Sequence, residues 1–440
     1  MTTDRTASTI DDTQPAAPGG NRRLLSAAGP GGTALPLAEH RRSYPAPPRS
    51  RRGRPDIVAM VERAGLLGRG GAGFPTGRKL RAVASGRRRP IVVVNGTEGE
   101  PLSGKDGLLL RTAPHLVLDG AALAAAAVGA REVVVCVDRI NRAGLAAVER
   151  ALAERAGREP DAVPMRLAAT PPHYVTGEES ALVHWINGGE AKPTRVPPRP
   201  FEKGVEGRPT LVDNVETLAH LAQIVRFGSE WFRQTGTVTE PGTILTTVTG
   251  AVSRPGIYEV PAGSSLADLL TRAGTPEGVS AVLVGGYFGF WLDVPSARDA
   301  RLSHEDLRRR GGGLGCGAIA VLPAGACGLT EAARVMGWLA GETAGQCGPC
   351  VHGLAALAGT LGEACRGRAR GDVVPRLLRW SAQIEGRGAC RFPDGAVRFL
   401  RSTLDVFGDD LRRHATGRPC PGAAKAGLLP IPDTRRAPWR

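Results

Sequence analysis

The sequence is poor in aromatic residues, in lysine and in cysteine. Aromatic side chains make up 4% of the 440 residues, which argues against a surface that stacks nucleic-acid bases. Lysine occurs at five positions, so nearly all positive charge is arginine, a bias that a GC-rich genome produces without a functional cause. Eight cysteines are too few for a disulfide scaffold in a chain of this length.

Long apolar runs and a targeting segment are also missing. The N-terminus has no apolar stretch of the kind found in a signal peptide. The most apolar region, residues 115–137, is interrupted by Asp119, Arg131 and Glu132 and falls short of the ~20 clean residues of a membrane span. We therefore expect a cytoplasmic protein, in which cysteines are more often thiols, metal ligands or redox groups than bridges.

The formal net charge of +15 is concentrated at the two ends of the chain. Residues 1–54 hold nine arginines against four acidic residues, and residues 411–440 hold six arginines and one lysine against one aspartate. The rest of the chain is left with +4. Basic tails can bind polyanions, but these have no amphipathic period. We interpret residues 1–54 and 415–440 as solvated, disordered tails and expect no nucleic-acid partner.

The region 55–240 reads as an alternation of strands and helices. Strands are expected at 90–94, 132–137 and 165–169, and helices at 56–67, 115–130, 142–156 and 178–187. This order predicts an α/β domain with a parallel, Rossmann-like sheet. Ligands bind at the carboxyl ends of such strands, where the loops after Val94 and Ala169 would lie.

The pattern changes near residue 242. Strands at 244–252, 257–260, 281–284 and 288–292, with a helix at 264–273, predict a β-grasp module over residues 241–325. From residue 329 the pattern is helical, with breaks at 343–350, 366–373 and 385–393. Residues 326–414 are therefore expected to form a compact helical bundle.

A glycine-rich loop begins at Gly68. Gly68, Gly70 and Gly73 satisfy G-x-G-x-x-G, but no strand precedes them, which makes an ordinary dinucleotide site unlikely. Glycines let a backbone approach a phosphate, and Lys79 could neutralise it. A plain surface loop is the alternative.

Two groups of polar, mostly acidic residues lie at positions where ligands could bind. Asn95, Glu98 and Glu100 follow a buried strand, where they could bond to ribityl or ribose hydroxyls or form an exposed acidic turn. Glu178 and Glu179 lie at a predicted helix start, where the helix dipole favours them without any cofactor.

Three cysteines have the spacing of metal or cluster ligands. Cys347 and Cys350 form a C-x-x-C pair, and Cys390 lies in a later helix break. Cys365 and His352 are candidate extra ligands, and buried idle thiols are the alternative. The remaining cysteines are predicted to be idle thiols: Cys136, Cys316, Cys327 and Cys420.

Taken together, these motifs resemble the NADH-binding flavoprotein (51 kDa-type) subunit of respiratory complex I and related hydrogenase and formate dehydrogenase diaphorase subunits. The glycine loop at 68–79 is similar to the family's flavin loop. The colinear motifs continue at 95–106, 174–180, 209–217, 346–350 and 390–395. Residues 243–292 resemble the family's soluble-ligand-binding β-grasp insert.

The resemblance implies electron transfer from NADH through FMN and an iron–sulfur cluster to a ferredoxin-like or other redox protein, with at most peripheral membrane association through a partner. It implies catalytic roles for Glu100 and Glu179 beside the nicotinamide nucleotide. The implied cluster ligands are Cys347, Cys350 and Cys390. The implied residues around FMN and NADH are Gly68, Arg69, Gly70, Gly71, Ala72, Phe74, Lys79, Asn95, Glu98, Tyr174, Gly177, Glu178, Asn214 and Thr217.

The chain departs from the family pattern at several positions. Ala344 replaces the first cluster cysteine, so a four-iron cluster needs a substitute ligand; a three-iron cluster or no cluster are the alternatives. Thr97 replaces an acidic residue. Arg199, Val196 and Ala82 stand where the family has an aromatic, a lysine and an aromatic. Two other functions stay open: an electron relay that does not use NADH, and a non-redox binding module with zinc or no metal.

Overall fold

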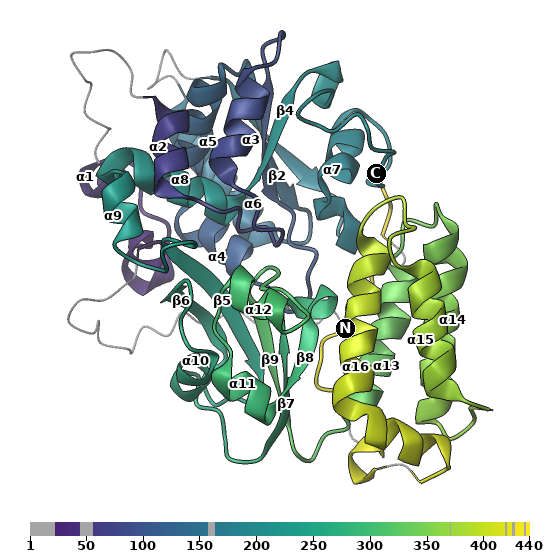
Figure 1. Cartoon of the computed structure of the whole chain (residues 1–440). Helices are drawn as coiled ribbons and strands as arrows, with labels where there is room; N and C mark the ends of the chain where they lie inside the picture. The colour runs from purple at the N-terminus through teal and green to yellow at the C-terminus, as the bar shows by residue number, and fades with distance from the viewer. Residues whose placement is uncertain are drawn as a thin grey trace.

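The computed structural model describes residues 23–44, 56–156, 163–369, 371–418, 420–424, 427–434 and 437–440. Three parts follow one another along the chain: an α/β domain, a second domain built on a five-stranded sheet, and a helical bundle (Figure 1). The bundle lies beside both other parts, and the C-terminus returns to the α/β domain.

The α/β domain is built on a four-stranded parallel sheet with strand order β3-β2-β1-β4. The strands are rich in valine and isoleucine because helices cover both faces of the sheet. Asn95 on β1 pairs with Asn214 at the end of β4, so two polar residues meet at the carboxyl edge. The strands are β1 (Ile91–Gly96), β2 (Glu132–Asp138), β3 (Met165–Thr170) and β4 (Thr210–Asn214).

Helices of different lengths cover the two faces. Val92 and Val94 face a core shared with α5 (Pro114–Val128) and α8 (Val215–Phe227), while Ile91 and Val93 face α7 (Glu179–Ile186). α5 and α8 touch at Gly120, where a Cβ atom would lie 1.9 Å from the Leu218 carbonyl oxygen. The remaining helices are α2 (Ile57–Ala64), α3 (Thr76–Ala84), α4 (Lys105–Thr112), α6 (Arg142–Arg155) and α9 (Ser229–Arg233).

The second domain is a five-stranded sheet with order β6-β5-β9-β7-β8, in which only β5 and β9 pair in parallel. One face packs on α10 (Leu266–Arg272), which Ser265 caps, and the other packs against the bundle. Its other elements are β5 (Thr243–Gly250), β6 (Gly256–Pro261), β7 (Val279–Val284), β8 (Phe290–Asp293), β9 (Ala318–Pro323), α11 (Val294–Asp299) and α12 (His304–Arg309). The sequence indicated every strand here except β9.

The bundle contains four α-helices and a π-helical turn, with breaks where the sequence predicted them. They are α13 (Gly328–Gly341), the π-helical turn Pro349–Leu354, α14 (Ala355–Cys365), α15 (Val373–Ile384) and α16 (Phe392–Ala415). α16 joins the bundle to the second domain, since the Ser402 hydroxyl accepts a hydrogen bond from the Trp291 backbone N–H at 3.0 Å. The predicted fold class is confirmed.

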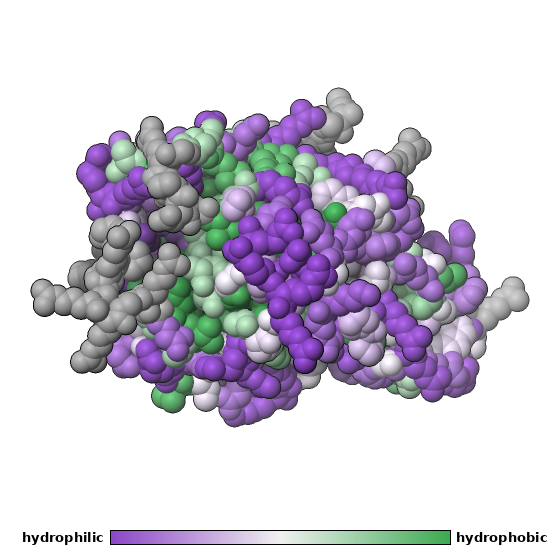
Figure 2. Space-filling model, turned by 90° about the horizontal axis from the view of Figure 1, so that it is seen from above, coloured by the Kyte–Doolittle hydropathy of each residue, from purple (hydrophilic) through white to green (hydrophobic). Residues whose placement is uncertain are grey.

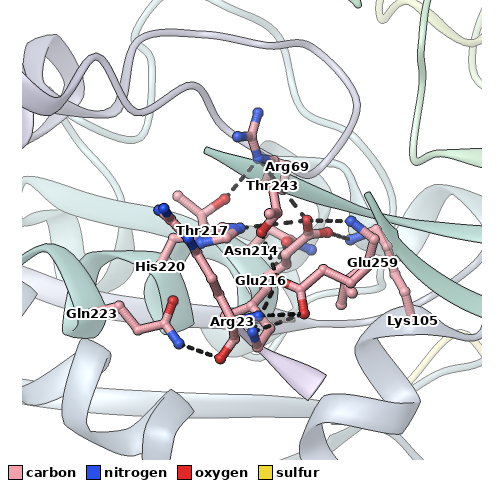
Figure 3. Close-up of polar contacts among 12 residues, drawn as sticks. Arg23, Arg69, Lys105, Asn214, Glu216, Thr217, His220, Gln223, Thr243 and Glu259 are labelled. Carbon is pink, nitrogen blue, oxygen red and sulfur yellow. Dashed lines mark hydrogen bonds and ion pairs between the residues drawn. The ribbon is translucent and has the colours of Figure 1, made fainter. Parts of the chain in front are cut away.

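The prediction that residues 1–54 are disordered is wrong for residues 23–44. This segment forms two 3-10 turns (Leu25–Ala27 and Pro30–Gly32) and α1 (Leu37–Ser43), and it buries Leu24 and Leu37. Glu259 on β6 accepts the backbone N–H groups of Arg23 and Leu24 at 2.9 Å (Figure 3). The Arg23 guanidinium stacks 3.9 Å above the Trp231 ring. Residues 1–22 and 45–54 lie outside the described residues.

The prediction of a disordered tail at 415–440 is also wrong for its described parts. Leu429 is buried in the bundle core, and the Thr434 hydroxyl donates to the buried carboxylate of Glu342. Trp439 stacks on His173 of the α/β domain with 3.6 Å between ring centroids. Apolar and aromatic side chains, together with the bond from Thr434, thus fix a segment that is basic and rich in small residues.

The face seen from above in Figure 2 is mostly hydrophilic, with a hydrophobic area toward the left, next to atoms drawn in grey. Among the described helices, none alone combines the length and apolar composition of a membrane span. The pair α4 and α5, bent by 97°, passes that test on length and composition only.

Candidate functional site

The glycine-rich loop is closed on itself and lies on the N-terminus of α8. The Gly68 N–H donates to the Phe74 carbonyl at 2.8 Å, which closes the loop. Gly73 has a φ of +63°, and a Cβ atom there would lie 2.7 Å from the His304 ring. The Arg69 N–H donates to Thr217 Oγ1 at 2.9 Å. The loop therefore needs a glycine at position 73, while Gly70, Ala72 and Phe74 are exposed.

A buried charge network lies under this loop (Figure 3). The Lys105 ammonium is 2.8 Å from Asp106 and 2.9 Å from Glu216, and Arg69 lies 4.0 Å from Glu216. Burial alone would raise the pKa of Glu216, but Lys105 and its other cationic neighbours overcome it and lower this pKa to about 2. Asn214 Nδ2 donates to Asp106 at 2.6 Å, which ties the end of β4 to the network.

Asn95 and Glu98 hold together the segments around the end of β1. Asn95 Nδ2 donates to the Gly177 carbonyl at 2.8 Å. The Glu98 carboxylate accepts the N–H groups of Asp106 at 3.1 Å and Gly107 at 2.9 Å, and so caps α4. Glu98 is buried, so the exposed acidic turn considered from the sequence is not formed.

Glu100 lies where the α/β domain meets the second domain. Its carboxylate accepts the Tyr287 N–H at 2.8 Å, the Leu102 N–H at 3.2 Å and the Tyr174 hydroxyl at 3.0 Å. Burial raises the pKa of Glu100 to about 7, and these donors only partly offset that rise. Tyr174 in turn packs edge-on against Phe288. A carboxyl group that titrates near neutral pH is therefore built into the site.

Glu178 and Glu179 have different environments although they are adjacent. Glu178 caps α7 by accepting the N–H groups of Ser180 and Ala181, so the capping role considered from the sequence is the one observed. Burial raises the pKa of Glu178. Glu179 is one-third exposed and has two cations near it, Lys79 at 3.6 Å and Arg199 at 3.9 Å.

Lys79 is occupied by groups of the chain itself. Its ammonium donates to the Val212 carbonyl and lies 3.9 Å from Asp213, besides its contact with Glu179. Burial raises the pKa of Asp213 to about 6, although Lys79 opposes the rise. Phe74, half exposed at the tip of the glycine loop, lies beside Arg78.

Several buried polar atoms have no partner among the described residues. Those near the site belong to Thr76, which follows the loop, to Thr176 beside Gly177, and to Asp213 beside Asn214. Buried polar groups normally have a hydrogen-bond partner, so these atoms are free to bind a polar ligand. With the glycine cradle, they fit a phosphate- and hydroxyl-bearing cofactor such as FMN. A small hollow of about 10 Å³ lies beside the loop, lined by Arg69, His304 and Cys316 among others.

Cys347, Cys350 and Cys390 come together at the end of the bundle that faces α7. Burial raises the pKa of Cys350, and the neighbouring thiols of Cys347 and Cys390 raise it further. Burial also raises the pKa of Cys390, and the nearby Glu178 carboxylate raises it further. Three converging thiols fit an iron–sulfur cluster, and Ala344 offers no fourth ligand.

Cys365 is not the substitute ligand. Fifteen residues of nearly continuous helix separate it from Cys350, about 20 Å at 1.5 Å per residue. Its thiol instead lies near those of Cys327 and Cys420. Burial raises the pKa of Cys365, and these two thiols raise it further. Cys136 is buried in β2, as predicted, and burial raises its pKa to about 12.

The sequence analysis assigned no role to three other residues that the structure places at the site. His304 packs on Gly73, the Tyr287 N–H bonds Glu100, and Glu216 balances Lys105. Only Glu216 lies in one of the colinear motifs, whereas His304 and Tyr287 come from the second domain and reach the site through the tertiary fold.

Comparison with known proteins agrees with this geometry. Residues 61–223 match the Nuo51 FMN-binding domain, residues 245–276 the SLBB domain, and residues 330–414 the NADH-ubiquinone oxidoreductase-F iron-sulfur binding region. The F subunit of the NADH-quinone oxidoreductase of Mycobacterium tuberculosis is 32% identical over 396 residues, 85% of this chain and 88% of its own length. The chain belongs to the family of NADH-quinone oxidoreductase F subunits.

Other relatives of this oxidoreductase chain include hydrogenase subunits. The NADP-reducing hydrogenase subunit HndC of Solidesulfovibrio fructosivorans is 30% identical over 392 residues, covering 85% of this chain and 79% of its own. A crystal structure of NAD+-reducing [NiFe]-hydrogenase in the H2-reduced state superposes with a TM-score of 0.76 and 30% identity, covering 89% of this chain and 67% of that one.

The resemblance inferred from the motifs is confirmed. The matched FMN-binding domain contains the glycine loop, and the matched iron–sulfur region contains Cys347, Cys350 and Cys390. The chain is therefore a flavin- and iron–sulfur-dependent electron-transfer oxidoreductase subunit.

Proposed function

We propose that this chain takes electrons from NADH and passes them to a redox-protein partner. When bound, FMN would take up two electrons together and release them singly to an iron–sulfur cluster, while the protein supplies position and electrostatics. The names of the relatives, an NADH-quinone oxidoreductase subunit and hydrogenase subunits, support a partner of this kind.

One observation carries the proposal: the segment 174–180 contacts both halves of the site. At one end, the Gly177 carbonyl accepts from Asn95 at the flavin edge of the sheet. At the other, Glu178 lies within electrostatic reach of Cys390 at the cluster end of the bundle. A flavin and a cluster held on either side of one short segment would be close enough for electron transfer.

The residues proposed to hold FMN lie on the loop and at the strand ends. The backbone of Gly68, Arg69 and Gly70 would face the phosphate and ring, and Asn95, Asn214 and Thr217 would fix them from the sheet edge. The unpartnered Asp213 and Thr176 oxygens would bond to the hydroxyls. Glu98 and Glu178 would act as positioning residues, because helix N–H groups already occupy their carboxylates.

NADH would dock over Gly71, Ala72 and Phe74, which form the outer side of the loop. Half-exposed Phe74 offers a ring face to the nicotinamide. Glu100 and Glu179 would border the nucleotide, with the Glu100 carboxyl holding or releasing a proton near neutral pH. Cys347, Cys350 and Cys390 would bind the cluster, and His352, two residues after Cys350, or an exogenous ligand would replace the residue lost at Ala344.

A relay that does not use NADH is the second candidate, and the environment of Glu179 favours it. Lys79 and Arg199 already neutralise this carboxylate, and no aromatic side chain stands at position 199 to hold an adenine. In this reading, electrons would enter from a protein and not from a nicotinamide.

An anaerobic titration separates the candidates. Purified protein reconstituted with FMN is titrated with NADH while the flavin absorbance is followed, and iron and acid-labile sulfide are assayed on the same sample. Bleaching of the flavin supports NADH oxidation, and unchanged absorbance at millimolar NADH rejects it in favour of the relay. Protein that binds no FMN rejects both and leaves the non-redox binding module.

The cluster assignment is tested on the same preparations. Cys390→Ser should lose iron and sulfide, while Cys136→Ala, a buried thiol in β2, should keep both. Equal iron in the two variants would reject the ligand assignment. All eight cysteines are free thiols, which supports a reducing compartment, and the proposal places the chain in the cytoplasm.

A further inference from the structure

A second group of cysteines meets at the opposite end of the bundle. Cys327 precedes α13, Cys365 ends α14, His414 lies in the last turn of α16, and Cys420 follows that helix. The ligand atoms of Cys327, His414 and Cys420 all lie within 4.8 Å of one another. The sequence analysis predicted idle thiols at 327 and 420.

We propose that Cys327, His414 and Cys420 bind a Zn²⁺ ion, and that the neighbouring Cys365 becomes the fourth ligand once its side chain turns toward the ion. The distance from Cys327 Sγ to His414 Nε2 is 3.7 Å. Two ligands of a tetrahedral zinc ion, with Zn–S near 2.3 Å and Zn–N near 2.0 Å, lie about 3.6 Å apart. The observed spacing therefore fits a shared ion without movement of the helices.

The His414 ring is oriented as a metal ligand. Its Nδ1 lies 3.2 Å from the Cys365 carbonyl oxygen, to which Nδ1–H donates. This bond leaves the lone pair on Nε2, which points to the Cys327 thiol. Zinc-bound histidines characteristically donate their other ring N–H to a carbonyl or carboxylate. In the present structure Nε2 accepts the Cys420 N–H at 3.1 Å, and the metal would take the place of this donor.

Cys365 lies next to this group. Its Sγ donates to the Leu329 carbonyl at 3.5 Å, close to the start of α13, so it lies outside the set of ligand atoms within 4.8 Å of one another and would turn from this carbonyl to reach the ion. Three thiolates and one imidazole would then fill the coordination of zinc, which is the pattern of a structural site.

Such a site would fasten three helix ends and the C-terminal segment together. It would join the start of α13, the end of α14 and the end of α16. Cys420 begins the segment whose Leu429 fills the bundle core and whose Trp439 reaches His173. The ion would therefore hold in place the segment that covers the bundle and touches the flavin domain.

Metal analysis of the whole purified chain tests the site. We expect about one zinc per chain in the wild type and in the control Cys136→Ala, and loss of zinc in Cys420→Ser and in Cys327→Ser. Iron and sulfide should stay at wild-type levels in all of them, since Cys347, Cys350 and Cys390 are untouched. Zinc retained in both serine variants, or absent from the wild type, would overturn the proposal, as would additional iron at the zinc position.

A second measurement covers variants that fold poorly. Protein treated with a chelator is titrated with Co²⁺, and thiolate-to-cobalt charge-transfer absorption should appear in the wild type and in Cys136→Ala but not in Cys420→Ser. Intact mass under non-reducing conditions checks the competing chemistry: a Cys327–Cys420 disulfide would make the chain about 2 Da lighter, and this result would refute a metal site.

Discussion

The raised pKa of Glu100 makes a specific prediction about stability. The folded chain holds a proton on this carboxyl up to about pH 7, whereas the unfolded chain releases it near 4.5. Between these values the native state binds more protons, so the free energy of unfolding falls as the pH rises. At 1.36 kcal/mol per pKa unit the full effect is about 3 kcal/mol.

Glu100→Gln removes this titration and keeps the shape of the side chain. From pH 5.5 to pH 8 the wild type should lose about 2 kcal/mol that the variant does not lose. At roughly 2–4 °C per kcal/mol for a domain of this size, the wild-type Tm should fall by about 4–8 °C more than that of Glu100→Gln. Relative to the wild type, the stability of the variant should therefore be lowest at acid pH, where Glu100 is a neutral hydrogen-bonding group.

The assay is thermal unfolding at a series of pH values, followed by tryptophan fluorescence and by release of flavin fluorescence. Glu190, an exposed carboxylate beside Lys192, provides the matched control, and Glu190→Gln should track the wild type. Tm curves of wild type and Glu100→Gln that stay parallel from pH 5.5 to pH 8 would refute the reasoning that burial dominates at Glu100.

Three further predictions concern the loop, the N-terminal segment and the buried charges. Gly73→Ala should lose bound flavin and stability, whereas Gly129→Ala, at a similar φ with open space around it, should cost only about 1–2 kcal/mol; equal losses of Tm would reject a role for the His304 contact. Glu259→Gln should expose the Arg23–Leu24 peptide bond to trypsin. Unchanged digestion would show that the hydrogen bonds to Glu259 do not hold the N-terminal segment in place. Glu216→Gln should destabilise the chain by about 3–5 kcal/mol in denaturant unfolding, because Lys105 loses a buried partner; a loss under 1 kcal/mol would contradict this.

Local pattern was enough to predict most helices and strands of the fold. The valine-rich runs of β1 and β2 are buried strands, and the glycine and proline breaks end the helices of the bundle where expected. β4 and β9 were missed, and each pairs with a strand that lies far away in the chain. Their strand character depends on that pairing more than on their own residues.

The two terminal segments show the limit of predicting disorder from amino-acid composition. Residues 23–44 and the described parts of 420–440 are basic and rich in small residues, which predicts disorder. They are ordered because buried carboxylates far away in the sequence accept hydrogen bonds from them. Glu259 accepts from the first segment and Glu342 from the second. A long-range hydrogen bond to a desolvated carboxylate leaves no local signature.

The sequence by itself determined the family and supplied the candidate site residues, because each motif needs particular side chains within a few positions. Only the tertiary structure decided what those side chains can do. It committed Glu98 and Glu178 to helix ends, left Asp213 without a full set of partners, and sorted the cysteines into two groups. Cys327 and His414 are 87 residues apart yet nearly in contact, because burial and charge act through space.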